Sequence, residues 1–163
     1  MNIFVLNEDP YLAAQDMCDK HVVKMVLETG QMLSTVQRLH GNDDDRLYRM
    51  TNVFHPCTVW TGASRMNYKW VVDHFTALAL EYRYRYEKSH KTWHQLHHIV
   101  KDCPNDITLF NQTPFALAMP DEYKTDDAVQ SYRNYYLGEK HDILAYTKRD
   151  MPDWVECHLF AKC

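Results

Sequence analysis

The sequence predicts an all-α fold, a compact single-domain helical bundle with at most a short extended segment at residues 1–6. Apolar side chains recur at steps of three and four residues over long stretches, which is the period of a helix with one buried face. Asp, Ser and Pro residues precede these stretches, where helix caps and first turns favour them. Residues 1–6 form the one strand-like run, and a single strand cannot build a sheet.

Several stretches are expected to be helical. Asp9, Asp19, Ser64 and either Asp126 or Asp127 stand where they can cap four of them, and Gly41 follows the second. Residues 104–124 carry three prolines and no sustained period, so we expect them to form an ordered connection. The expected helical ranges are 10–17, 19–38, 56–62, 64–87, 89–100, 126–137 and 139–146.

Length and composition are those of an ordinary globular protein. The 163 residues fit one domain, 1–163, and a hydrophobic content of 45% supplies a core without a metal or a disulfide. No apolar run approaches the ~20 residues of a membrane span, and the opening MNIFVL lacks the features of a secretory signal. We therefore expect a cytoplasmic protein that binds no membrane.

Cysteine usage and charge narrow the function classes further. The cysteines are odd in number and include no C-x-x-C pair, so free thiols in a reducing compartment are expected. A net charge of −4 argues mildly against a dedicated duplex-DNA binder, because phosphate contacts supply most of such affinity. No cofactor is expected. The five cysteines are Cys18, Cys57, Cys103, Cys157 and Cys163.

The stretch 19–38 carries the first candidate site. Its polar side chains recur along one line of the helix, and its valines lie on another face. The line combines an imidazole, an ammonium, a carboxylate, an amide and a guanidinium, a mixture able to act on an anionic substrate. An ordinary solvent-facing stripe has the same composition, and the sequence leaves both interpretations open. The polar line consists of His21, Lys24, Glu28, Gln31, Thr35 and Arg38.

Aromatic and basic residues in the middle of the chain form a second candidate. Trp60 and Tyr68 lie close in sequence to Arg65, and this pairing of a π surface with positive charge suits a nucleotide base and its phosphate. Further along, tyrosines alternate with Arg83 and Arg85 near the end of a helix. These two arginines are further candidates for phosphate binding.

Two histidine motifs favour structural interpretations. His55 and Cys57 could form a nucleophile pair, but near neighbours in sequence rarely meet at hydrogen-bond distance, so a capping histidine and a core cysteine are favoured. His55 nevertheless stays among the candidate binding residues. Four histidines at helical spacing are a weak candidate for a metal site, and a partly solvated face is the favoured interpretation. They are His90, His94, His97 and His98.

Three blocks of the sequence carry a resemblance, namely DKHVVKM at 19–25, HPCTVW at 55–60 and FALAMPDEYK at 115–124. With them, the chain resembles a family of small, mostly uncharacterised proteins encoded by tailed bacteriophages. More distantly, about half of the chain is similar to the phage-type pyrimidine-dimer DNA glycosylases. Those enzymes are small and all-helical, and they excise a base and then nick the strand at the abasic site.

The second resemblance implies roles for individual residues. In the glycosylases an acidic residue of the helix assists a nucleophilic N-terminal amine that forms an imine with the sugar, and Glu28 is the matching carboxylate. Those enzymes expose the amine by removing the initiator methionine, whereas Asn2 is too large for that removal, so Met1 supplies the amine here. Gln31 stands where the glycosylases have a DNA-contacting basic residue, and Arg38 matches a second basic position.

Three functions follow from these observations. The first is an enzyme acting on nucleic acid, a glycosylase/lyase for base excision or modified-base processing, with Glu28 as acid/base and Lys24, Arg38 and Arg65 on phosphates. The second is a non-enzymatic protein that binds a small nucleotide and sequesters a signal of host anti-phage defence. The third is a protein-interaction domain. The oligomeric state stays open, with a homodimer across the aromatic helices as one arrangement, and the expected location is the host-cell cytoplasm.

Overall fold

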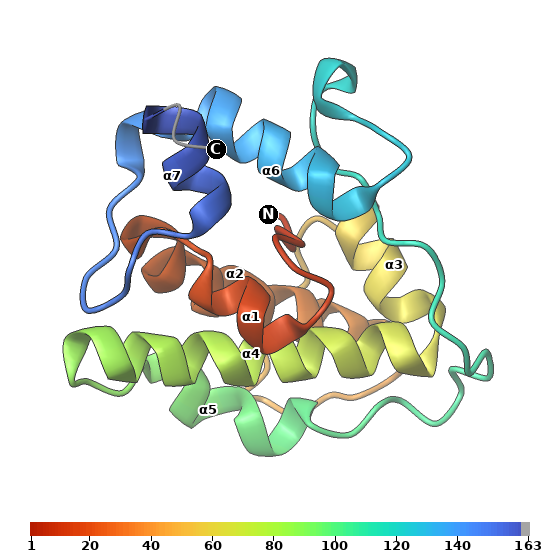
Figure 1. Cartoon of the computed structure of the whole chain (residues 1–163). Helices are drawn as coiled ribbons and strands as arrows, with labels where there is room; N and C mark the ends of the chain where they lie inside the picture. The colour runs from red at the N-terminus through yellow and green to blue at the C-terminus, as the bar shows by residue number, and fades with distance from the viewer. Residues whose placement is uncertain (161–163) are drawn as a thin grey trace.

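The computed structural model describes residues 1–160 and has an all-α fold, as predicted (Figure 1). Within these residues there is no strand, and no helix is long and apolar enough to cross a membrane. Two short 3-10 turns, η1 (Asp121–Tyr123) and η2 (His141–Ile143), accompany the α-helices. The α-helices are α1 (Pro10–Gln15), α2 (Asp19–Leu39), α3 (Pro56–Ala63), α4 (Arg65–Tyr86), α5 (Lys91–Val100), α6 (Ala128–Glu139) and α7 (Asp153–Phe160).

Helices α2 and α4 together form the centre of the packing, and α4 also contacts α3 and α5. Helix α2 contacts α3, α4 and α5, while α1 packs against α4. Gly30 is the point of closest approach to α5, because a Cβ atom there would lie 2.5 Å from Cγ2 of Thr92. The absence of a side chain at Gly30 therefore allows α5 to pack directly against α2.

Several predicted helix caps are confirmed. The Asp9 carboxylate accepts hydrogen bonds from two backbone amides of α1, the Ser64 hydroxyl accepts one from Asn67, and Asp127 caps α6. The prediction for Asp19 is wrong, because Cys18 occupies the cap position of α2 and Asp19 is its first residue.

The ends of the chain depart most from expectation. Residues 1–6 form no strand but an irregular segment, in which Phe4 has a left-handed φ of 39°. Within the expected range 139–146, only η2 and the last residue of α6, Glu139, are helical, and α7 was not expected. Its first turn is built on Pro152, whose carbonyl accepts hydrogen bonds from the amides of Val155 and Glu156. Proline is well suited to a helix start, although in the sequence it resembles an interruption.

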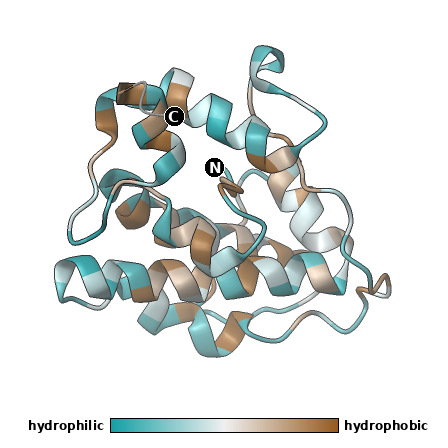
Figure 2. Cartoon of the chain, viewed as in Figure 1, coloured by the Kyte–Doolittle hydropathy of each residue, from teal (hydrophilic) through white to brown (hydrophobic). Residues whose placement is uncertain are grey.

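The N-terminal segment lies in the middle of the molecule, between α2 and α6 (Figure 1). The side chain of Asn2 fixes its course, since Oδ1 accepts from the amides of Ile3 and Phe4, and Nδ2 donates to the carbonyl of Ala118 at 2.8 Å. Ile3 and the neighbouring apolar residues are buried. By contrast, the loops around η1 and before α7 are largely hydrophilic (Figure 2).

The cysteines only partly follow the prediction. Cys18, Cys57 and Cys103 are free thiols. Cys157 is disulfide-bonded, so the expectation of a free thiol is wrong for this residue. Cys163 lies outside the described residues.

Candidate functional site

A small polar pocket lies between the N-terminal segment, α2 and α6. Its volume is about 160 Å³. The pocket collects residues that are far apart in the sequence, and α2 supplies the first three members of the predicted polar line, His21, Lys24 and Glu28. It is lined by Met1, Asn2, Phe4, His21, Lys24, Met25, Glu28, Tyr135 and Lys140.

An amine and a carboxylate meet in this pocket. The α-amino nitrogen of Met1 lies 3.3 Å from Oε2 of Glu28, and Nζ of Lys24 lies 3.1 Å from Oε1 of the same carboxylate. The Met1 side chain is buried, and its sulfur accepts a hydrogen bond from Oγ1 of Thr58 at 3.3 Å. Because the side chain is held by α3, the amine is aimed at α2.

His21 contributes a buried imidazole to the same pocket. Its ring stacks on Phe4 with a centroid distance of 4.6 Å and meets the edge of Tyr136 at 5.1 Å. Burial, aided by the positive charges of Lys140 and Lys24, lowers the pKa of His21 to about 4. Nδ1 is buried and has no hydrogen-bond partner within the described residues. The ring is therefore neutral at neutral pH and lines the pocket without adding charge.

Positive charge outweighs negative charge around the pocket. Lys24, Lys140 and the amine of Met1 face one carboxylate, that of Glu28. The Lys24 side chain is 65% exposed, so positive charge continues from the pocket to the surface. The protein as a whole carries a net charge of −4, so this region has the opposite sign and suits an anionic substrate.

His55 and Cys57 have the structural roles that were favoured. Nδ1 of His55 caps α3 by accepting from the amide of Cys57 at 3.2 Å. Burial raises the pKa of the Cys57 thiol to about 11, so the thiol is protonated and a poor nucleophile at neutral pH. Burial and the positive charge of the N-terminal amine lower the pKa of His55. The charge of the N-terminal amine therefore acts on His55 as well as on Glu28.

Two of the predicted phosphate-binding arginines are used inside the fold. Arg38 donates to three backbone carbonyls of the loop that follows α2. The side chain of Arg85 is 0% exposed and pairs with Asp19 at 3.0 Å and with Glu81 at 2.8 Å. Arg149 completes the cluster by pairing with Glu81 at 2.9 Å. Protein oxygens occupy the N–H groups of Arg85 and most of those of Arg38, so neither side chain is kept here as a phosphate-binding candidate.

Other predicted site residues lie apart from the polar pocket that contains the amine of Met1, which is called the amine pocket below. Gln31 is half-buried on α2 and Arg83 is exposed on α4, but neither lines the pocket. Trp60 is buried against Trp70 and Phe115, and its indole nitrogen donates to a backbone carbonyl. It therefore offers no face to a base.

The histidine cluster is divided among separate roles. His90 caps α5, and Nδ1 of His97 bonds to the carbonyl of Trp93 at 2.7 Å. The rings of His97 and His98 lie 3.7 Å apart, while His94 is exposed. Among the described residues, no group of three metal-ligating side chains is arranged to hold an ion.

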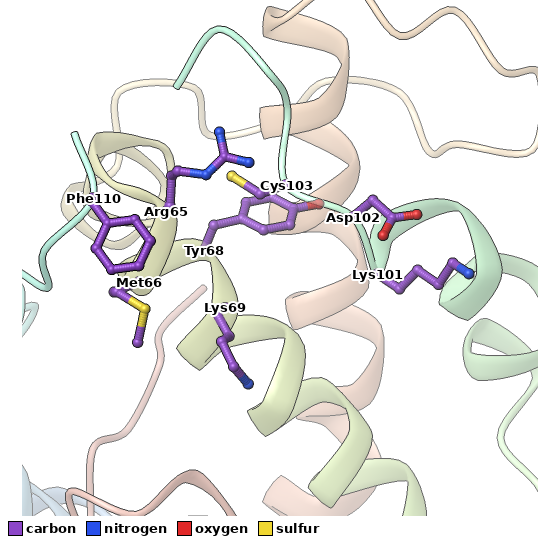
Figure 3. A pocket seen from close by; sticks show the side chains of 8 residues that line it. All are labelled: Arg65, Met66, Tyr68, Lys69, Lys101, Asp102, Cys103 and Phe110. Carbon is purple, nitrogen blue, oxygen red and sulfur yellow. The ribbon is translucent and has the colours of Figure 1, made fainter. Parts of the chain in front are cut away.

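Arg65 and Tyr68 line a different pocket, at the start of α4, with a volume of about 440 Å³ (Figure 3). The predicted residues therefore separate into two sites. The first joins Met1, Glu28, Lys24 and His21, and the second contains Arg65 and Tyr68.

The sequence did not identify Tyr135 and Lys140 as site residues. Both come from the region around the end of α6, and they reach the pocket because α6 packs over the N-terminal segment. No local pattern distinguishes them from other residues of this helix. Comparison of the chain with protein-family models, with curated proteins and with solved structures found no match.

Proposed function

We propose that this protein is a lyase that acts on the aldehyde of an abasic site in nucleic acid, with the α-amine of Met1 as nucleophile and Glu28 as acid/base. The observation that carries the proposal is the distance of 3.3 Å between the two groups in a pocket that a small molecule can enter. An amine beside a proton acceptor is the arrangement that imine chemistry needs.

The first step joins the enzyme to the sugar. The unprotonated nitrogen of Met1 attacks C1′ of the open-chain sugar, forming a C–N bond, and Glu28 accepts the proton that nitrogen releases. The carbinolamine then loses water, with the proton returned from Glu28 to the departing hydroxyl, and an imine remains. α-Amines suit this role because they are less basic than lysine amines, so more of the population is unprotonated at neutral pH.

The second step breaks the strand. The Glu28 carboxylate removes a proton from C2′, the electron pair of that bond forms a double bond, and the C3′–O bond breaks. The phosphate leaves with the electron pair of the broken bond. Water then hydrolyses the imine and restores the amine of Met1, so no oxidant, reductant or cofactor is consumed.

The size of the pocket favours a sugar over a complete nucleotide. Its volume of about 160 Å³ lies below the ~300–1,000 Å³ typical of pockets for drug-sized ligands. A sugar that has lost its base fits such a space, and the strand phosphates would stay outside. Lys24 and Lys140 supply positive charge for those phosphates, and the neutral ring of His21 forms part of the pocket wall.

Borohydride trapping tests the proposal. A duplex oligonucleotide with one abasic site is mixed with the protein and sodium cyanoborohydride, which reduces the imine to a stable amine. Wild-type protein should give a covalent adduct and, without reductant, a strand break. Glu28→Gln should slow both by about 10²-fold or more, because the proton acceptor is lost.

Glu8→Gln is the matched control, since Glu8 is exposed and does not line the pocket. It should trap DNA as fast as wild type. Failure of the wild-type protein to form an adduct, or equal trapping rates for wild type and Glu28→Gln, would refute the proposed lyase.

A further inference from the structure

The pocket at the start of α4 shares no lining residue with the amine pocket. It is lined by Arg65, Met66, Tyr68, Lys69, Lys101, Asp102, Cys103 and Phe110. Its volume of about 440 Å³ is within the ~300–1,000 Å³ range of small-molecule sites. In Figure 3, Phe110 and Met66 lie on one side, Lys101 and Asp102 on the other, and Arg65 and Tyr68 between them.

The loop that carries Phe110 is held in place by α4. The amide of Arg65 donates to the carbonyl of Leu109 at 2.8 Å, and the amide of Met66 donates to that of Phe110 at 3.1 Å. Nη1 of Arg65 donates to the carbonyl of Ile107 at 3.1 Å. The backbone of Phe110 is thus fixed by the first residues of a long helix.

The ring of Phe110 is exposed although its backbone is fixed. Phe110 is 62% exposed, and an exposed aromatic ring forgoes the free energy that burial would supply. Because its backbone is held, only the side-chain torsions of Phe110 need ordering when a flat partner stacks on the ring. Tyr68 adds only its ring to the pocket, because its hydroxyl accepts from Gln37 and donates to the carbonyl of Val100.

Three cationic side chains surround these rings, with one carboxylate. Lys69 pairs with Asp73 at 2.6 Å, whereas Lys101 is exposed at the end of α5. Arg65 has further N–H groups besides the one that bonds to Ile107. This local excess of positive charge occurs in a protein whose net charge is −4, so it marks the pocket as complementary to an anion.

We propose that this pocket binds a nucleoside monophosphate, with the base stacked on Phe110 and the phosphate on the guanidinium of Arg65, while exposed Lys101 adds positive charge at the edge of the pocket. The aromatic wall and the cations together select a ligand that has both a flat ring and a negative charge. The carboxylate of Asp102 can accept a hydrogen bond from a ribose hydroxyl or from an amino group of the base. The site is independent of the lyase chemistry proposed above.

Isothermal titration of the full chain tests this site. The probes are the four ribonucleoside 5′-monophosphates, with adenosine and inorganic phosphate as partial ligands. At least one monophosphate should bind saturably, about tenfold or more tightly than either partial ligand, because both the ring and the charge contribute. Phe110→Ala should weaken that binding about fivefold or more.

Lys101→Ala and Lys91→Ala form a matched pair at the two ends of α5. Both lysines are exposed, but only Lys101 lines the pocket. Lys101→Ala should weaken binding, and Lys91→Ala should not. Three results would each overturn the proposal: no binding of any monophosphate, equal binding of inorganic phosphate alone, or wild-type affinity in Phe110→Ala. The borohydride test reports on a separate pocket, so either proposal can fail without the other.

Discussion

The α-amine of Met1 and the carboxylate of Glu28 lie 3.3 Å apart because contacts from three parts of the chain position the amine. Thr58 of α3 hydrogen-bonds the Met1 sulfur, Asn2 is tied to the carbonyl of Ala118, and Phe4 packs among the aromatic rings of α2 and α6. The pair is thus formed before any substrate arrives. Preorganisation of this kind lowers the entropic cost of bringing a nucleophile to its target.

Phe54 is the residue we predict to contact duplex substrates of the proposed lyase. It is 93% exposed, and it precedes His55, which is near enough to the amine for its pKa to be lowered by that charge. On the proposed lyase, an exposed ring that adjoins His55 in the chain can enter the gap left by a missing base and stack there. We expect Phe54→Ala to reduce cleavage of duplex abasic DNA about tenfold, and cleavage of single-stranded abasic DNA much less.

Thermal unfolding provides the control for Phe54→Ala, because removing a side chain that is 93% exposed should leave stability within about 0.5 kcal/mol. Leu80 is also exposed and apolar, but it lies on α4. Leu80→Ala should leave the cleavage rates of duplex and of single-stranded abasic DNA unchanged. Equal losses on duplex and single-stranded DNA would contradict a stacking role for Phe54.

Acid should destabilise the fold through two buried histidines. Burial lowers the pKa of His21 and of His74 to about 4, from 6.5 in the unfolded chain. The stability that these two neutral histidines provide is complete above pH 6.5 and is lost as the pH falls toward 4. In that window the histidines are protonated in the unfolded chain but stay neutral in the folded protein, so acid favours unfolding. The free energy of unfolding should therefore drop by about 2 kcal/mol per histidine between pH 8 and pH 5.

Urea unfolding across this pH range measures the effect. His74→Gln should remove about half of the pH-dependent loss, whatever its effect on stability at pH 8. His94→Gln, at an exposed histidine, should keep the whole loss. If His74→Gln retained the full pH dependence, His74 would not be the buried neutral group that the structure describes.

Arg85 is expected to stabilise the fold rather than bind phosphate. Arg85→Met would leave Glu81, whose side chain is 3% exposed, with Arg149 as its remaining partner in the cluster. Breaking one side of a buried ion cluster should lower the free energy of unfolding by about 3 kcal/mol. Arg83→Met, at an exposed position of the same helix, should change it by less than about 0.5 kcal/mol. Equal stabilities in urea for the two variants would exclude this role.

Gly30→Ala should destabilise the contact between α2 and α5. The new Cβ would lie 2.5 Å from Cγ2 of Thr92 and 3.0 Å from Cδ1 of Leu96, so the Thr92 side chain or α5 itself must shift. Overpacking costs about 1–3 kcal/mol, which exceeds the ~1 kcal/mol that alanine gains over glycine in a helix. Adding Thr92→Ser, which removes Cγ2 but keeps the hydroxyl that meets Tyr48, should restore most of the stability.

Gly62→Ala is the control for this contact. Its Cβ would find its nearest neighbour at 3.6 Å, an ordinary contact distance, so Gly62→Ala should be neutral or slightly stabilising in urea. A stable Gly30→Ala protein would mean that α5 packs less closely than the structure describes.

Helices were predictable where pattern and capping agree. The expected range 19–38 matches α2 closely, and the cap at Ser64 was correct because both depend on neighbours in the sequence. The side chain environments were less predictable. Arg38 and Arg85 have the same pattern as solvent-facing arginines, and only the carbonyls and carboxylates brought by distant segments turn them inward.

The candidate site was half predictable for the same reason. Glu28 and the amine of Met1 were expected together from the glycosylase resemblance, and the structure brings them together. The rest of the pocket depends on tertiary packing, since Tyr135 and Lys140 join it only where α6 covers the N-terminal segment. A helical period cannot reveal which residues of two distant helices will face each other.

The site of covalent attachment tests the central claim most directly. The protein is trapped on abasic DNA with cyanoborohydride and digested, and mass spectrometry locates the adduct, after the intact mass has shown that Met1 is retained. The sugar should be attached to the α-amine of the N-terminal peptide and absent from peptides that contain Lys24 or Lys140. Attachment to either lysine with an unmodified Met1 would contradict an N-terminal nucleophile paired with Glu28.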